Sequence, residues 1–88
     1  EVIALARVVA RHGGLYDTHQ RDESSYGIGL LASTAEAIRI GREAGVRVHI
    51  AHLKALGADV WGRSDSLIAI IERARASGVS VTADQYPY

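Results

Sequence analysis

The sequence predicts an α/β fold of about three consecutive βα units whose strands run parallel. Helix-like and strand-like hydrophobic patterns alternate along the 88 residues in the order α-β-α-β-α-β. Glycines that end the predicted helices recur at positions 13, 45 and 78, which are almost evenly spaced. A polar side chain recurs at the end of each predicted strand, since His19, His52 and Gln85 follow one another at equal intervals.

This repeat length suits two architectures. A period of roughly 33 residues matches one βα unit of a (β/α)8, or TIM-type, barrel, in which ligands bind at the C-terminal ends of the strands. A doubly wound parallel sheet has the same local pattern and binds ligands at the same edge. The residue pattern leaves both open, and both predict a functional site at the strand ends.

The first unit begins with a helix. Apolar residues spaced three and four apart predict an amphipathic helix from Val2 to Arg11, and His12 followed by Gly13–Gly14 ends it. Leu15–His19 is predicted to be a short strand. The polar and glycine-containing residues 21–29 are predicted to form a loop.

The second unit contains the strongest predicted strand. Ser33 and Glu36 form a capping-box pattern, which predicts a helix that begins at Ser33 and ends at Gly45. Val46–Leu53 is predicted to be a buried strand because its first residues are mostly β-branched. The helix residues expected to face the core are Ala35, Ala37 and Ile38.

The third unit repeats this order. Residues 54–63 are predicted to form a loop, and Ser64 or Asp65 is expected to cap the helix that Gly78 ends. Val79–Ala83 is predicted to be the last strand. The apolar positions expected to face the core are Leu67, Ile68, Ile70 and Ile71.

Composition narrows the classes of protein. The length suits a single small domain, residues 1–88, with no second domain. Ten basic and ten acidic residues balance, so neither nucleic acid nor an acidic membrane surface is an expected partner. The chain has no cysteine, which excludes disulfides, and no apolar run approaches the roughly 18 residues that cross a bilayer.

Two histidines are candidate metal ligands. His19 and His52 end adjacent predicted strands, and neighbouring parallel strands lie about 4.8 Å apart. Two inward imidazoles at matched heights could therefore share one zinc ion at Zn–N distances of roughly 2.0–2.1 Å. The alternative is a pair of histidines with ordinary hydrogen bonds. His49 lies three residues before His52 and is predicted to face the helices, whereas His12 is predicted to be a helix C-terminal cation.

Two cations follow these histidines. Arg21 and Lys54 each lie two residues after a candidate ligand, where they would suit an anionic substrate group such as a carboxylate. From the residues alone, an ion pair with an acidic neighbour is the favoured alternative. The acidic residues available for it are Asp22, Glu23 and Asp59.

Tyr86 follows the last predicted strand and is a candidate for contact with a reacting carbonyl. A tyrosine hydroxyl in such a place can donate to a developing oxyanion. The alternative is an aromatic ring that packs beside Pro87. The residue pattern supports both interpretations equally.

Four motifs carry a family resemblance. Residues 14–23, 48–54, 61–62 and 82–88 resemble, in order and spacing, the D-aminoacylase (N-acyl-D-amino-acid deacylase) branch of the amidohydrolase superfamily. The resemblance extends over the whole chain. It implies that the chain is a fragment of a (β/α)8 catalytic barrel, comprising strands five to seven with their helices.

The resemblance also implies a function and site residues. Residues His19 and His52 are expected to bind zinc, one or two ions serving the parent enzyme. Lys54 and Arg21 are expected to contact an N-acyl-amino-acid substrate, and Tyr86 the developing oxyanion. The reaction implied is zinc-dependent hydrolysis of the amide bond of N-acyl-D-amino acids.

Several parts of the family's site have no counterpart here. These are an H-x-H pair, a bridging cysteine and the aspartate that acts as general base. The 88 residues are therefore expected to be inactive alone, and turnover of an N-acetyl-D-amino acid with added zinc would contradict this. Three strands leave two open sheet edges, so self-association is expected.

Other functions stay open at this point. One is a different amidohydrolase, dihydroorotase-like or dipeptidase-like. Another is a non-catalytic βα-repeat fragment whose histidines bind no metal. Zinc titration of His19→Ala and His52→Ala variants would separate this last possibility, because it predicts no difference from wild type.

Overall fold

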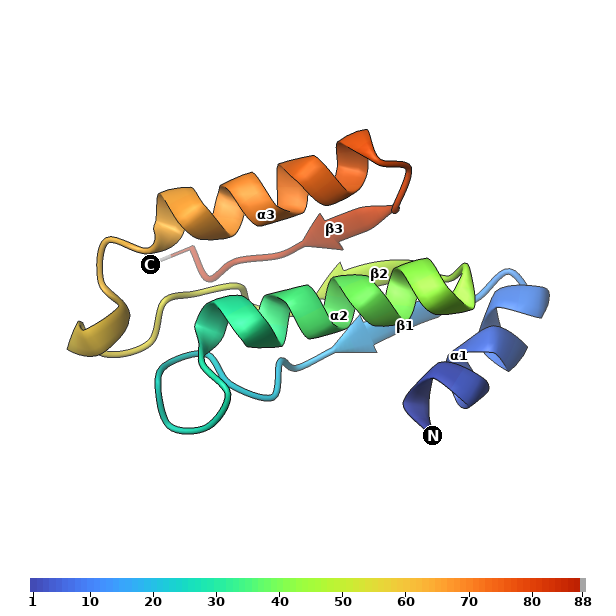
Figure 1. The fold of residues 1–88 in the computed structure, drawn as a ribbon, viewed down its shortest axis with the longest axis horizontal. Helices are drawn as coiled ribbons and strands as arrows, with labels where there is room; N and C mark the ends of the chain where they lie inside the picture. The colour runs from blue at the N-terminus through green and yellow to red at the C-terminus, as the bar shows by residue number, and fades with distance from the viewer. Residues whose placement is uncertain (88) are drawn as a thin grey trace.

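The computed structural model describes residues 1–87, so Tyr88, part of the fourth motif, lies outside the described residues. Helices and strands alternate as predicted, and the strands form one parallel sheet in the order β1-β2-β3 (Figure 1). A short 3-10 helix precedes the last α-helix. The elements are α1 (Val2–Arg11), β1 (Leu15–Thr18), α2 (Leu30–Ala44), β2 (Arg47–Ile50), η1 (Ala58–Val60), α3 (Ser64–Ala76) and β3 (Val81–Ala83).

The core lies between the sheet and two helices. Val48, Ile50 and Val81 point from β2 and β3 toward the helices and are fully buried. Helices α2 and α3 lie side by side over this face of the sheet (Figure 1). Their buried contributions to the same cluster are Ala37, Ile38 and Ala74. The alternation of β-branched residues in β2 therefore places one face of the strand against the helices.

The opposite face of the sheet has no helix over it among the described residues. Asp17, His49 and Thr82 lie in register across this face, and His49 Nδ1 hydrogen-bonds to Thr82 Oγ1 at 2.8 Å. The prediction that His49 faces the helices is wrong. Strand β2 ends at Ile50, and His52 has a left-handed backbone with φ of 39°, so the alternation of faces does not continue from His49 to His52.

Helix α2 begins before the predicted capping box. Its first residue is Leu30, with Gly29 as N-cap at φ 89°, so the predicted start at Ser33 is wrong. Ser33 is buried inside the helix, and its hydroxyl accepts a hydrogen bond from the backbone N–H of Asp22 at 3.0 Å. The predicted end is confirmed, because Gly45 adopts the left-handed conformation at φ 68°.

Two residues predicted to face the core are exposed instead. Ala35 is exposed on α2 and Ile68 is 50% exposed on α3, so both predictions are wrong, whereas Leu67 is buried as predicted. Arg63 is the N-cap residue of α3 and no side chain caps the helix, so neither Ser64 nor Asp65 has its predicted role. No described helix has the length and apolar character required to span a membrane.

Helix α2 approaches the sheet closely at Gly41. A methyl group on this residue would overlap the side chain of Val48 and lie 3.2 Å from the carbonyl oxygen of Val46. Glycine therefore permits the close packing of α2 on β2. The strands are shorter than the sequence predicts, and the residues that follow them leave the sheet as loops carrying the polar side chains.

Candidate metal centre

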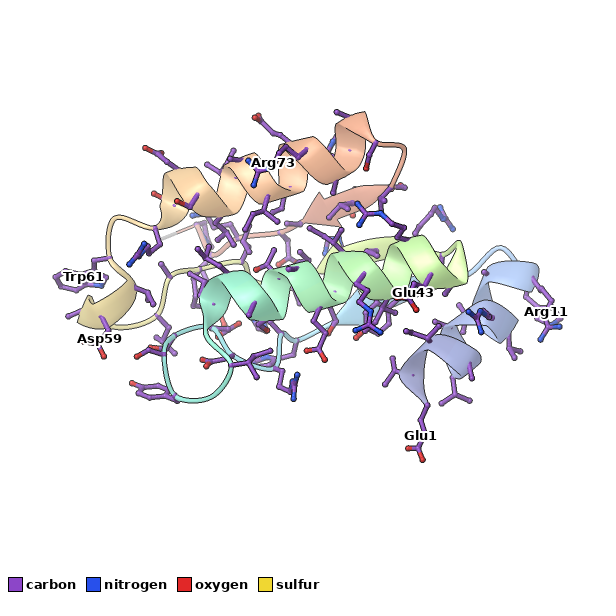
Figure 2. The ribbon with its side chains drawn as sticks, viewed as in Figure 1. Glu1, Arg11, Glu43, Asp59, Trp61 and Arg73 are labelled. Carbon is purple, nitrogen blue, oxygen red and sulfur yellow. The ribbon has the colours of Figure 1, made fainter. Side chains whose placement is uncertain are left out.

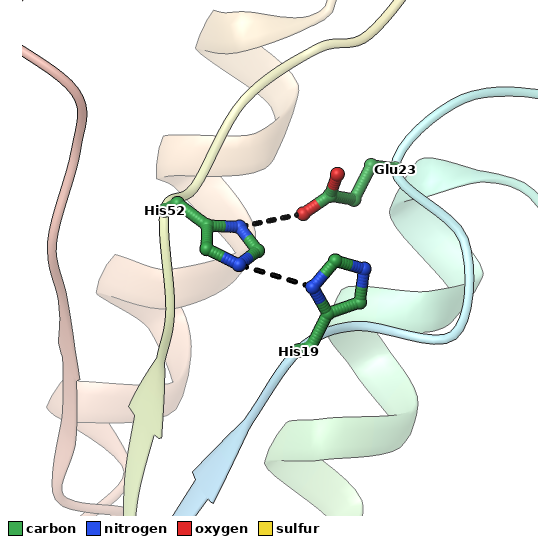
Figure 3. A group of neighbouring side chains, drawn as sticks. All are labelled: His19, Glu23 and His52. Atoms are coloured by element: carbon green, nitrogen blue, oxygen red, sulfur yellow. Dashed lines mark hydrogen bonds and ion pairs between the residues drawn. The ribbon is translucent and has the colours of Figure 1, made fainter.

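The two candidate histidines are direct neighbours in the structure. His19 follows β1 and His52 follows β2, and Nδ1 of His19 lies 3.0 Å from Nε2 of His52 (Figure 3). Two nitrogen ligands of one tetrahedral zinc ion lie roughly 3.3 Å apart when each Zn–N distance is about 2.05 Å. The observed separation therefore fits two ligands of a single ion.

A carboxylate completes the cluster. Glu23 lies in the loop after β1, is 8% exposed, and places Oε1 2.9 Å from Nδ1 of His52. Side-chain nitrogen and oxygen atoms of His19, Glu23 and His52 all lie within 4.8 Å of one another, which makes this the one group of such side chains in residues 1–87 that could hold a metal ion. Figure 3 shows that His19 and Glu23 contact different nitrogens of the His52 ring.

Lys54 brings a positive charge to the same cluster. Its Nζ lies 2.8 Å from Oε1 of Glu23 and 2.8 Å from Nδ1 of His52. Glu23 is one of the acidic residues that the sequence suggests as an ion-pair partner for this lysine. Because the lysine also reaches the histidine, the ion pair does not remove it from the site.

Tyr86 joins the cluster from the third strand end. Its ring stacks on the imidazole of His52, with centroids 5.7 Å apart and an interplanar angle of 20°. The Nζ of Lys54 lies 5.0 Å from the centre of the tyrosine ring. All three strand ends thus contribute to one site, as the evenly spaced repeat predicts.

Arg21 is placed differently from Lys54. Its guanidinium forms a two-point ion pair with Glu36 of α2, at 2.9 and 3.0 Å, and its side chain is 63% exposed. Glu36 is not among the acidic partners that the sequence suggests. The described hydrogen bonds of the guanidinium go to Glu36 and not to the histidines, and a substrate contact by Arg21 stays a prediction. Trp61 of the third motif is 74% exposed and projects outward beyond η1 (Figure 2).

Asp84 holds the backbone of His52 in place. Its carboxylate accepts hydrogen bonds from the backbone N–H of His52 and from the side chain of His49, the latter at 3.3 Å. The His52 N–H is the main reason that the pKa of Asp84 lies below its ordinary value, followed by His49. The main-chain oxygen of Asp84 also accepts from the N–H of Leu53 at 2.9 Å. These contacts stabilise the left-handed turn that aims the His52 ring at His19.

The loop that carries Glu23 is held together by hydrogen bonds to Asp22, the residue before it. The carboxylate of Asp22 accepts three backbone hydrogen bonds, from Ser24 at 2.8 Å, Gly27 at 2.6 Å and Gly29 at 2.9 Å. These donors, led by Gly27, hold the pKa of Asp22 below its ordinary value. Glu23 is therefore presented to His52 from a loop with a defined backbone.

We predict that Asp22→Asn lowers the melting temperature of the chain at pH 7 by roughly 5–10 °C, because the amide nitrogen that replaces one carboxylate oxygen cannot accept the backbone hydrogen bonds of that oxygen. The stabilisation by Asp22 is fully present above the ordinary aspartate pKa of about 3.9 and is lost as the pH falls through the lower folded pKa. The difference between wild type and variant should therefore shrink below about pH 4. Thermal unfolding at several pH values measures both effects.

Asp59→Asn is the matched control. Asp59 is exposed, and its described side-chain hydrogen bond is with the hydroxyl of Ser25. Equal melting temperatures for the two variants at pH 7 would contradict the role assigned to Asp22.

Sequence reasoning missed the place of Glu23 and Asp84 in the site. The sequence suggests Glu23 only as a surface ion-pair partner, and it distinguishes Asp84 only by its position after the last strand. The signal that could have found Glu23 is its position four residues after His19 in a polar loop. No pattern in the sequence shows that this loop folds back over the end of β2.

Fold and site together define a class of protein. The chain is a parallel α/β unit that gathers imidazole, carboxylate and ammonium groups at the carboxyl ends of its strands. This is the arrangement of α/β proteins that bind a metal ion and a small ligand at the strand ends.

Comparisons with known proteins identify the family. No protein-family model matches the chain. The D-aminoacylase of Alcaligenes xylosoxydans xylosoxydans is 42% identical over 88 residues, which are 100% of this chain and 17% of that protein. The N-acyl-D-glutamate deacylase of Bordetella bronchiseptica is 39% identical to the chain, and its structure matches with a TM-score of 0.91. That structure contains zinc and a phosphonate inhibitor that mimics the tetrahedral intermediate of the reaction. The match covers 99% of this chain and 18% of that one. A structure from work on the binuclear metal centre of D-aminoacylase is 40% identical with a TM-score of 0.88, at the same coverage.

The chain belongs to the D-aminoacylase, or N-acyl-D-amino-acid deacylase, family. It spans about 17% of the length of the curated relatives it matches first. Its three helices and three parallel strands match part of the D-aminoacylase fold, which confirms the predicted fold class.

Proposed function

We propose that the chain supplies part of the metal centre of a zinc-dependent enzyme that hydrolyses the amide bond of N-acyl-D-amino acids. The observation that carries this proposal is the 3.0 Å contact between His19 and His52 at the ends of adjacent parallel strands. The relative from Bordetella bronchiseptica binds zinc and a mimic of a tetrahedral reaction intermediate. By this likeness, β1, β2 and β3 correspond to strands five to seven of a (β/α)8 barrel.

Each side chain at the strand ends has a proposed role. His19 and His52 bind zinc, which when bound supplies a Lewis acid for the substrate carbonyl. Lys54 pairs with the carboxylate of the substrate, since its ammonium lies within reach of the histidines. Tyr86 directs its hydroxyl to the developing oxyanion. A substrate contact by Arg21 would require its release from Glu36.

The open face of the sheet supports a second part of this proposal. Asp17, His49 and Thr82 line it without cover among the described residues, as expected for the inward face of a barrel. The outer edges of β1 and β3 pair with no other strand in the described part of the chain. We propose that these edges let the isolated chain self-associate.

A chimera tests the proposed function. In it, this chain replaces the segment it matches in the D-aminoacylase of Alcaligenes xylosoxydans xylosoxydans, since the match covers all 88 residues. We expect zinc-dependent deacylation of an N-acetyl-D-amino acid with kcat/KM within about 100-fold of the parent enzyme, because a misplacement of about 1 Å costs that much. The chain alone with zinc is expected to show no turnover.

The chimera is informative only when it is folded. Circular dichroism and gel filtration that match the parent enzyme establish this. A folded chimera without activity would contradict the proposed function.

A further inference from the structure

We infer that Glu23 is a positioning residue that holds both His52 and Lys54, through contacts of its carboxylate with Nδ1 of the imidazole and with the ammonium. This inference rests on the proposed zinc-binding role of His19 and His52. It concerns how these residues are held, and it adds Glu23 to the residues on which the site depends.

His19 and Glu23 contact different nitrogens of the His52 ring. The two nitrogens of an imidazole point away from each other, and in His52 Nε2 faces His19 whereas Nδ1 faces Glu23 (Figure 3). The ammonium of Lys54 lies 2.8 Å from Nδ1, and its charge repels a cation at that nitrogen. An ion shared by His19 and His52 would therefore be held through Nε2, which would leave Nδ1 to Glu23.

Metal binding then determines the tautomer of His52. A metal-bound Nε2 has no proton, so the proton resides on Nδ1, which donates to Oε1 of Glu23 at 2.9 Å. In this tautomer Nδ1 cannot accept from Lys54. The lysine therefore depends on its second acceptor, the same Oε1 of Glu23 at 2.8 Å. One carboxylate oxygen holds both donors.

Burial and backbone contacts give Glu23 a defined position. Its side chain is 8% exposed, and a buried carboxylate is stable only with charged or hydrogen-bonding partners, which Lys54 and His52 provide. The backbone oxygen of Glu23 accepts from the N–H of Leu56 at 2.8 Å, which links the loop after β1 to the loop after β2. Glu23 thus connects the proposed metal ligand with the proposed substrate-binding cation.

Metal titrations of the chain test the inference. Zn²⁺ affinity is measured by calorimetry for wild type, Glu23→Gln, Glu23→Ala and His52→Ala. We expect both Glu23 variants to bind Zn²⁺ roughly 10- to 100-fold more weakly, as is typical when the partner of a metal-bound histidine is removed. Glu43→Gln is the matched control, because Glu43 forms an exposed ion pair with Arg39 on α2, and it should bind as wild type does.

Spectroscopy separates a positioning residue from a ligand. The imidazole ¹⁵N and ¹H resonances of the Zn²⁺-loaded wild type should show a proton on Nδ1 of His52, and this proton should exchange faster in Glu23→Ala. The Co²⁺ absorption band of Glu23→Gln, near-isosteric with wild type, should keep the wild-type shape because the ligands are unchanged. A band altered as by loss of a ligand would overturn the inference.

The Zn²⁺ affinities test the zinc-binding role of His52 separately from the positioning role of Glu23. Equal Zn²⁺ binding by wild type and His52→Ala contradicts the zinc-binding role itself. Weakened binding by His52→Ala together with unchanged binding by Glu23→Gln contradicts only the role of Glu23.

Discussion

His52→Ala in the chimera is expected to lower kcat/KM by roughly 1,000-fold or more, equivalent to about 4 kcal/mol of transition-state stabilisation. The substitution removes the imidazole whose Nε2 lies 3.0 Å from His19 and whose Nδ1 lies 2.9 Å from Glu23. The proposed zinc site would lose one ligand, and Glu23 would lose the imidazole that shares its carboxylate with Lys54. Steady-state kinetics with an N-acetyl-D-amino acid and the zinc content per protein chain measure the two effects together.

His12→Ala is the control for this experiment. His12 is the exposed C-cap residue of α1 and contributes nothing to the cluster, so the same substitution there should leave kcat/KM within about twofold of the unmutated chimera. A His52→Ala chimera that keeps its zinc content and its activity would show that this histidine is not a ligand.

Ile50→Ala is expected to destabilise the chain by about 2–5 kcal/mol, the usual cost of emptying a fully buried aliphatic site. Ile50 ends the central strand β2, is 0% exposed, and packs in the cluster formed with α2 and α3. This loss is a large share of the roughly 5–15 kcal/mol by which domains are stable. Urea unfolding followed by circular dichroism measures it.

Ile68→Ala provides the matched comparison. Ile68 lies on α3 and is 50% exposed, so its truncation should cost about 0.5 kcal/mol. Similar midpoints for the two variants would mean that the core does not depend on β2. Ile50 lies two residues before His52. Its packing in the core therefore also fixes the point at which the chain that carries His52 leaves the sheet.

The site is assembled from three strand ends and two loops. His19, His52 and Tyr86 follow β1, β2 and β3, and each strand packs at least one side chain against the core cluster under the helices. Because the strands are parallel, their carboxyl ends meet at one edge, where successive units add side chains to the same place. This explains why an even repeat along the sequence predicts proximity in space.

The sequence by itself predicted the alternation of helices and strands, the parallel arrangement and the proximity of His19 and His52. These follow from local hydrophobic periodicity and from a repeat length, which are properties of the chain read residue by residue. The placement of Lys54 and Tyr86 at the same edge follows from the same repeat, and the contacts with His52 agree with it.

The tertiary structure alone decided which residues complete the site. Glu23 reaches His52 because the loop wound around Asp22 folds over the end of β2, and loop–loop contacts between units leave no periodic pattern in a sequence. The face of His49 was predicted wrongly because alternation holds only within a strand, and β2 ends at Ile50. Contacts between the loops of different units thus depend on tertiary packing, which local sequence patterns do not encode.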